Sequence, residues 1–379
     1  MGPLQGLRII EVAGIGPGPF CAMVLADLGA DVVRVDRTSA VGEPTGSERY
    51  DVLGRGRHSI AVDLKHAAGA EVVLRLVEGA DALTEGFRPG VAERLGIGPA
   101  ACLARNRALV YGRMTGWGQE GPLAGAAGHD LTYSAVAGAL AHIGRAGELP
   151  SPPLNLVADF GGGGMLLAVG LLAGIHHARR TGTGQVVDAA MVDGAALLMA
   201  PFFGASAIGF WSDERGTNLL DSGAPFYDVY RCGDGQEIAL GAIEPPFFAA
   251  LLEVLDLEQG SLPDQMDRAG WPTLRAAIAH ALAGRTRDEW LTLAEGRDAC
   301  LAPVLTMSQA RAHPHVAARD TIVEVDGVPQ PAPAPRFSET PPALDRPPPS
   351  PGEHTDDVLM AAGFERAELD ELRHAGVIA

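Results

Sequence analysis

Short apolar runs alternate with segments of helical period through the first half of the chain. An apolar run at residues 7–12 leads through a loop of glycine and proline into a helical pattern at 20–28, and a second apolar run follows at 31–36. This order is typical of a βαβ unit, whose two strands lie parallel with a right-handed crossover. The alternation continues with strand patterns at 58–63, 81–84, 108–114 and 185–188 and helical patterns at 67–77, 99–105, 165–180 and 191–199. We therefore predict a doubly wound α/β domain that binds its ligands at the carboxyl ends of the strands.

The pattern changes after residue 223. Two alternating runs at 226–231 and 236–242 flank Gly233-Asp234-Gly235, which is typical of a hairpin. Helical patterns follow at 245–255, 272–283 and 286–295, and a strand pattern at 301–305. We interpret these elements as a smaller α+β domain.

These patterns predict four parts of the chain. They are the first part of the large domain at 1–200, a linker at 201–222, the small domain at 223–318, and a return segment at 319–379 that completes the large domain. Within the return segment, the proline-rich residues 329–351 are predicted to be extended, and residues 353–372 to be helical.

Composition restricts the class of ligand. The 379 residues are 47% apolar and 20% charged, which is typical of a globular protein. The formal charge of −18 argues against nucleic acid or an anionic membrane as the main partner. An anionic ligand would therefore need cations gathered locally.

The cysteines and the apolar stretches predict an intracellular protein without a metal. Four cysteines are scattered without a C-x-x-C pair, which disfavours a zinc site or a disulfide framework. The N-terminus lacks the regions of a signal peptide. The uncharged stretch 194–211 is about long enough to span a bilayer, but Pro201 interrupts it. We interpret it as a buried helix and its exit, and we expect a cytoplasmic protein without stable membrane association.

The loop after the first strand raises the possibility of dinucleotide binding. Gly14, Gly16 and Gly18 precede a helical pattern, and Asp36 lies about twenty residues further on. The spacing is G-x-G-x-G with prolines between, whereas the dinucleotide fingerprint requires G-x-G-x-x-G. NAD binding is therefore an alternative interpretation only.

Basic residues gather where the predicted strands begin and end. Arg37 follows the second strand, Arg55 and Arg57 precede the third, Lys65 follows it, and Arg88 follows the fourth. Each one alone is typical of a solvated surface charge. Together, in so acidic a protein, they are a candidate phosphate site.

The stretch from 128 to 164 holds the candidate chemistry. His129 and Asp130 precede one helical pattern, and Asp159, with the glycines 161–164, precedes another. Two proton-transfer groups and backbone N–H groups can share one pocket in this arrangement. The acids also fit the role of helix N-caps, so both interpretations stand at this point.

Several longer runs of sequence resemble those of the family III CoA-transferases, and within them the α-methylacyl-CoA racemases. The matching runs are 6–8, 14–19, 26–37, 61–65, 85–90, 114–119, 128–130, 155–159 with its glycines, 184–188, 241–245, 335–338 and 352–356. The resemblance covers almost the whole chain. It implies a Rossmann-like large domain, a smaller α+β domain, and a homodimer of two interlocked rings that binds acyl-CoA thioesters.

The resemblance also implies roles for individual residues. His129 and Asp159 correspond to the proton-transfer pair of the racemases, and Glu244 to a glutamate that orients the histidine. Acyl-CoA contacts are expected from Arg37, Arg55, Ala61, Lys65, Arg88, Gly128 and Asp130. The expected reaction is cofactor-independent and metal-free, with CoA as part of the substrate.

Two other functions remain open from sequence. One is a CoA-transferase that forms an acyl-aspartyl intermediate, although the sequence does not decide between Asp130 and Asp159 as its nucleophile. The other is a non-catalytic acyl-CoA-binding protein. The acyl group itself is not determined by the sequence.

Overall fold

Six strands form one parallel sheet in the order β3-β2-β1-β4-β5-β6. The computed structural model describes residues 2–42, 46–344 and 346–379. The strands are β1 (Arg8–Val12), β2 (Asp31–Asp36), β3 (Arg57–Ala61), β4 (Ala82–Glu85), β5 (Val110–Thr115) and β6 (Gln185–Ala190). This is the strand order of doubly wound nucleotide-binding folds, with the order reversing between β1 and β4. The predicted α/β class is confirmed, and each strand was located within a few residues of its bounds.

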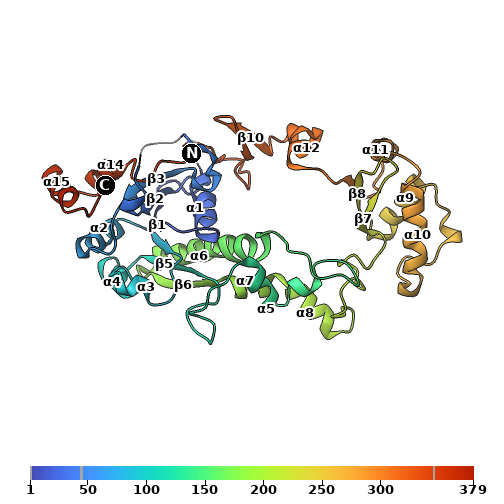
Figure 1. Cartoon of the computed structure of the whole chain (residues 1–379), viewed down its shortest axis with the longest axis horizontal. Coiled ribbons are helices and arrows are strands. Elements are labelled where there is room, and N and C mark those ends of the chain that lie inside the picture. Colours follow the sequence, from blue (N-terminus) through green and yellow to red (C-terminus); the bar gives the residue numbers. More distant parts are fainter. Residues whose placement is uncertain (1, 43–45, 345) are drawn as a thin grey trace. The chain divides into compact units, whose positions relative to one another are not determined.

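Helices cover both faces of the sheet because its apolar residues alternate in direction. Ile9 and Val32 pack on one face and their neighbours Ile10 and Val33 on the other, and all four are fully buried. The first face carries α1 (Pro17–Asp27), α5 (Asp130–Val136), α6 (Leu166–Thr181) and α7 (Met191–Leu198) (Figure 1). The second carries α2 (Ala67–Glu78), α4 (Pro99–Arg105), α14 (Thr355–Ala361) and α15 (Arg366–His374).

A ten-residue π-helix, Leu156–Met165, runs directly into α6. Its glycines allow close packing on two sides. A side chain at Gly164 would meet Phe20 of α1, and one at Gly162 would meet the backbone of Gly194 on α7. The stacked rings of Phe20 and Phe160, 4.5 Å apart, fix the same junction. The π-helix can therefore pack closely between α1 and α7 because glycines without side chains lie at both contacts.

The return segment covers the outer edge of the sheet. The backbone N–H of Gly56 donates to the carbonyl oxygen of Arg346 (3.1 Å), and the backbone N–H of His354 donates to the carbonyl oxygen of Ser59 (2.8 Å). The segment carries the hairpin β10 (Ile322–Val325) and β11 (Val328–Pro331), then runs without a helix to α14, as predicted, apart from Asp345, which lies outside the described residues. Residues 353–372 were predicted as one helix, but α14 and α15 are separate because Gly363, at φ +86°, turns the chain between them.

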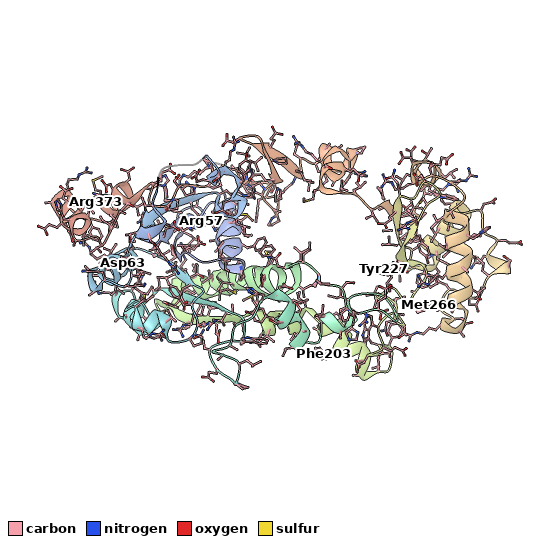
Figure 2. The ribbon with its side chains drawn as sticks, in the orientation of Figure 1. Arg57, Asp63, Phe203, Tyr227, Met266 and Arg373 are labelled. Carbon is pink, nitrogen blue, oxygen red and sulfur yellow. The ribbon has the colours of Figure 1, made fainter. Side chains whose placement is uncertain are left out.

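Arg57 is the first residue of β3 and connects this strand to its neighbours (Figure 2). Its side chain is fully buried, and its Nε donates to Glu11 of β1 at 2.5 Å. The guanidinium also donates to the carbonyl oxygens of Pro19, in α1, and Leu53. One buried guanidinium thus ties β3 to β1, to α1 and to the turn at Leu53.

A second compact unit comprises residues 138–153 and 200–318. Its sheet, in the order β7-β8-β9, packs against α9, α10 and α11 around Phe226, Phe248 and Trp271. The elements are α8 (Ala200–Ala207), β7 (Tyr227–Arg231), β8 (Glu237–Gly241), α9 (Pro245–Val254), α10 (Trp271–Leu282), α11 (Arg287–Ala294), β9 (Leu301–Pro303), α12 (Met307–Ala312) and α13 (Pro314–Ala318). Residues 201–222, expected to be a linker, fall within this unit, and residues 319–379 belong to the large one.

The apolar stretch 194–211 is divided between two short helices, α7 and α8, and no residue of α8 is buried, so the expectation of a buried helix is wrong. By length and composition alone, the continuous helical stretch Leu156–Thr181 would suffice to cross a membrane, and 39% of its most apolar window is buried in the fold. Helices in the cores of soluble proteins pass the same test, so this is weak evidence for a membrane span.

The contact of Gly162 with Gly194 predicts a position-specific effect of alanine. A Cβ at Gly194 would lie 1.8 Å from the carbonyl oxygen of Gly162, so we expect Gly194→Ala to cost about 1–3 kcal/mol or more of the free energy of unfolding. The control is Gly204→Ala in α8, where nothing lies within 4 Å and the substitution should be neutral or stabilise by up to about 1 kcal/mol. Thermal unfolding of both variants checks this, and equal melting temperatures would contradict the packing described.

Candidate functional site

A cavity of about 730 Å³ opens where β1, β2, β4 and β5 end. Its lining includes the loop 13–19, the loop 86–89, the segment 114–117, Gly128, His129, Tyr133, Asn155 and Asp159. Ligands of open parallel sheets bind at this edge, and the cavity spans the position between β1 and β4 at which the strand order reverses. The structure therefore gathers at one place residues that are widely separated in the sequence.

Asp130 positions the acidic end of this site. Its carboxylate is buried, and one oxygen accepts hydrogen bonds from the backbone N–H groups of Ala158 (2.7 Å) and Asp159 (2.8 Å). The other oxygen accepts from the hydroxyl of Ser134 at 3.3 Å. Asp130 therefore holds the start of the π-helix, a capping role that it plays for the following helix rather than its own.

Asp159 is half-buried and lines the cavity. Burial raises the pKa of its carboxyl above the ordinary value, and the charge of Asp130 raises it further. A hydrogen bond from Asn155 and the nearby His129 act in the opposite direction. The carboxyl lies beside Gly16, where a Cβ would come within 3.5 Å of Oδ2. An aspartate in this place holds its proton to a higher pH than an exposed one.

His129 occupies the N-cap position of α5. Its backbone N–H donates to the hydroxyl of Thr132 (3.0 Å), which in turn donates to the carbonyl oxygen of His129 (2.8 Å). The backbone around the imidazole is thus fixed, and the side chain remains exposed at the cavity. The predicted imidazole and carboxyl line one cavity, as the proton-transfer interpretation requires.

Tyr133 and Trp117 form a wall that sequence reasoning missed. Their rings meet edge to face with centroids 4.8 Å apart. A Cβ at Gly116 or Gly128 would come within 2.2 or 2.5 Å of the Tyr133 ring, so both glycines are required by its approach. The position of Tyr133, one helical turn after His129, was a signal for the same face.

The predicted basic residues separate into two groups. Arg37, after β2, and Arg88, after β4, are exposed and line the cavity. Lys65 is exposed beyond the end of β3, whereas Ala61 is buried at that end.

Arg55 requires a correction. It is 3% exposed and its guanidinium binds both oxygens of Asp27, Gln330 and the carbonyl oxygen of Pro331. All three nitrogens of its guanidinium thus bind groups of the fold, and Arg55 is removed from the candidate CoA contacts.

Glu244 belongs to the second unit. It occupies the N-cap position of α9, but its side chain makes no capping hydrogen bond, and it is exposed. Glu244 therefore precedes a helix without capping it through its side chain.

The backbone donors also differ from expectation. The sequence suggested backbone N–H groups near Asp130 or the glycines 161–164 as donors in the pocket, but at the start of the π-helix the N–H groups of Ala158 and Asp159 bind Asp130. In the first turn of α1, Pro17 and Pro19 have no N–H, so Gly18 is the donor that this stretch of the cavity wall can offer.

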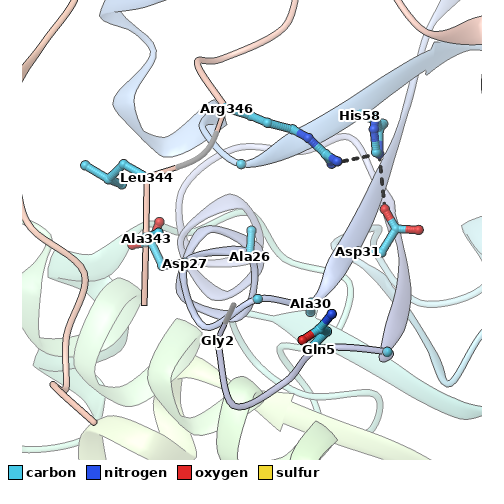
Figure 3. Close-up of a pocket in the computed structure, with 13 residues that line it drawn as sticks. Gly2, Gln5, Ala26, Asp27, Ala30, Asp31, His58, Ala343, Leu344 and Arg346 are labelled. Carbon is cyan, nitrogen blue, oxygen red and sulfur yellow. Dashed lines mark hydrogen bonds and ion pairs between the residues drawn. The ribbon is translucent and has the colours of Figure 1, made fainter. Parts of the chain in front are cut away.

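A second cavity, of about 360 Å³, lies where the return segment passes the N-terminal loop (Figure 3). His58 is its central polar group, with Nδ1 lying 3.1 Å from Asp31 and 3.3 Å from Arg346 (Figure 3). Asp27, also in its lining, is paired with Arg55. The charged groups of this cavity are thus paired, and His58 with Arg346 joins β3 to the return segment, so we assign the chemistry to the larger cavity.

Comparison with known proteins relates most of this chain to one family. The model of "CoA-transferase family III" matches residues 4–355. A Mus musculus protein named alpha-methylacyl-CoA racemase is 45% identical over 378 residues, 99% of this chain and 97% of that protein. The Homo sapiens protein of the same name is 44% identical over 380 residues. A CAIB/BAIF family protein from Brucella suis has a similar structure, with a TM-score of 0.81, 26% identity, and coverage of 95% of this chain and 99% of that one.

The two roles of Asp130, hydrogen-bond acceptor and charge, can be separated by substitution. Asp130→Asn keeps an oxygen for the N–H groups of Ala158 and Asp159 but removes the charge, so the pKa of Asp159 should fall. Asp130→Ala leaves both N–H groups without their acceptor and should cost about 1–3 kcal/mol for each group that stays buried and unpaired. NMR titration of ¹³C-labelled aspartates, assigned with Asp159→Asn, checks the pKa, and urea unfolding checks stability. An unchanged Asp159 titration in Asp130→Asn would show that the charge of Asp130 does not reach it.

Proposed function

The chain belongs to CoA-transferase family III, and we propose how it acts there as an α-methylacyl-CoA racemase, with His129 and Asp159 as its two proton-transfer groups. The observation that carries the proposal is that an exposed imidazole and a half-buried carboxyl line the same cavity at the carboxyl edge of the sheet. The substrates are 2-methylacyl-CoA thioesters.

The reaction inverts the α-carbon by moving one proton off and another on. A base removes the α-proton from one face of the thioester, which gives an enolate, and an acid delivers a proton to the opposite face. In one direction neutral His129 accepts the proton and protonated Asp159 donates its own. In the reverse direction the Asp159 carboxylate accepts and the imidazolium of His129 donates. The pair carries one proton between its members before and after each turnover, so the step needs no metal or cofactor.

The environment of Asp159 suits this exchange. An ordinary exposed aspartate would be too weak a base to take a proton from a thioester α-carbon. Burial and the charge of Asp130 raise its pKa, which strengthens it as a base and keeps its protonated form present at higher pH. The N–H of Gly18 is the candidate donor to the enolate oxygen, since preorganised donors stabilise such a charge most where water is excluded.

CoA is an anionic ligand, and in so acidic a protein such a ligand needs a site where cations are gathered. Arg37 and Arg88 are the exposed arginines in the cavity lining, and we assign them to the phosphates of CoA, with Lys65, beyond β3, as a further contact. We also assign Gly128 and Ala61 to CoA, because such small residues would let the ligand approach the backbone closely.

We also propose that the active form is a homodimer of interlocked chains in the cytoplasm, in which Glu244 of one chain supports His129 of the other. The apolar surface of the helices around the site supports this. Val136 of α5, Leu156 of the π-helix, Val169 of α6 and Leu197 of α7 are each at least half exposed. Single monomers rarely expose so many large apolar side chains on helices that pack together.

The proton-transfer roles predict a specific pattern of isotope exchange. One enantiomer of a 2-methylacyl-CoA in D₂O should gain α-deuterium and drift toward both epimers, and His129→Ala and Asp159→Ala should each slow this about 10²–10⁴-fold. NMR and chiral chromatography measure exchange and epimer ratio. The control is Arg179→Ala, whose side chain is 61% exposed in the last turn of α6.

The same assay separates the alternative functions. CoA exchange that appears only after a second carboxylic acid is added would move the chain to the transferases, with Asp159 as the nucleophile facing the cavity. CoA binding that survives both substitutions, without any turnover in the parent, would leave a binding protein.

The role of Glu244 across the dimer predicts complementation. His129→Ala and Glu244→Gln should each be nearly inactive alone. Co-expressed, a mixed dimer would contain one site with both native residues, and about half of the parental activity per mixed dimer should return. If Glu244 serves its own chain, both sites of the mixed dimer carry a defect and no activity returns. Light scattering on the purified mixture confirms the dimer.

A further inference from the structure

A buried glutamate connects two of the loops that line the cavity. Glu85, the last residue of β4, is 4% exposed and belongs to the cavity lining. One of its oxygens accepts the backbone N–H of Phe87 at 2.6 Å. This bond closes the turn that leads from β4 into the loop 86–89, which includes Arg88.

The other oxygen of Glu85 faces Arg113. This residue stands opposite Glu85 on β5, and its Nε lies 3.6 Å from Oε1 of Glu85. That Nε is buried and has no hydrogen-bond partner. The terminal nitrogens of Arg113 bind Gln119 (2.6 Å) and Glu93 of α3 (Val91–Arg94). Glu85 and Arg113 therefore lie between the loop of Arg88 and the loop of Trp117.

We propose that Glu85 is a positioning residue for substrate binding, which orients the loop 86–89 through its bond to Phe87 and its approach to Arg113. The proposal rests on the assignment of Arg88 to CoA. Glu85 itself takes no part in proton transfer to the substrate. Its carboxylate form holds the loop because an ionised acceptor binds an N–H more strongly than a neutral acid does, and because only the ionised form attracts Arg113.

The charge of Glu85 changes within the range in which enzymes work. Burial raises the pKa of Glu85 to about 7, against the opposing effects of the Phe87 N–H and Arg113. The titratable and charged groups that face it are Arg113 and Tyr111 on β5 and Glu93 on α3, and the charge of Glu93 is one of the causes of the raised pKa. Below this pH Glu85 is neutral and the loop is held less firmly. Above it, Glu85 is ionised and Arg88 is held in place.

The proposal predicts how the KM for acyl-CoA depends on pH. In the parent enzyme KM should rise about fivefold as the pH falls from 8 to 6, since a hydrogen bond to a charged group is stronger than a neutral one by roughly this factor. Glu85→Gln keeps an oxygen for Phe87 but carries no charge. Its KM should stay at the high value across this range, with kcat at pH 8 changed much less than KM.

The pH has the opposite effect on the stability of the fold. The folded pKa of Glu85 lies above its unfolded value, so its contribution to stability is present below the unfolded pKa and is lost as the pH rises through about 7. Glu85→Gln should therefore unfold at a higher temperature than the parent at pH 8, with a smaller difference at pH 5. A variant that is more stable and yet binds substrate less tightly separates positioning from a general loss of structure.

The binding experiment uses 3′-dephospho-CoA, because a phosphate monoester titrates near pH 6 and would add its own pH dependence. Isothermal titration calorimetry from pH 5.5 to 8 compares the parent with Glu85→Gln, Glu93→Gln and Arg88→Ala. Glu93→Gln should keep the change of affinity with pH but move it to lower pH, because it removes a charge that raises the pKa of Glu85. A parent affinity independent of pH, or an unchanged profile in Glu85→Gln, would overturn the proposal. If Arg88→Ala binds as tightly as the parent, the CoA assignment fails instead.

Discussion

The site depends on one buried carboxylate that receives two backbone N–H groups. Asp130 ends the loop that carries His129, and its oxygen binds the first turn of the π-helix that carries Asp159. The two proposed proton-transfer groups, His129 and Asp159, are 30 positions apart in the chain. The same carboxylate of Asp130 thus supplies the hydrogen-bond acceptor that holds the start of the π-helix and a charge that raises the pKa of Asp159. The glycines of the π-helix complete the constraint by allowing α1 and α7 to approach.

A large part of this arrangement could be predicted from the sequence. Apolar periodicity located the strands, and the exits of parallel strands predicted that Arg37 and Arg88 belong to one site, where both line the cavity. Local pattern made His129, Asp130 and Asp159 candidates and left open whether the acids were caps, and the resemblance to the racemases then selected His129 and Asp159 as the expected pair. The structure answers that question differently for each, since Asp130 is a cap for a distant helix and Asp159 faces the cavity.

The rest depends on contacts that local pattern does not encode. Arg55 has the charge and the position of a phosphate ligand, but Asp27 on a neighbouring helix neutralises it. The π-helix cannot be read from a 3.6-residue period. Glu85 reads as an ordinary strand residue, and its significance arises only from burial beside Arg113. Tertiary burial, which decides whether a charge is free or paired, is therefore the information that the sequence alone lacks.

Residues 377 and 378 pair with the chain just beyond β3, at the edge of the sheet. Ile378 forms a bridge with Val62, and Val377 accepts the N–H of Asp63 at 2.8 Å. The edge of the sheet beside β3 thus receives these partners from residues 377 and 378, which are made long after the strand itself. While the ribosome still holds those residues, the nascent large unit exposes an open parallel edge, and exposed edges are sites of wrong pairing. During synthesis the edge of the sheet beside β3 therefore stays open to wrong pairing until residues 377 and 378 reach it.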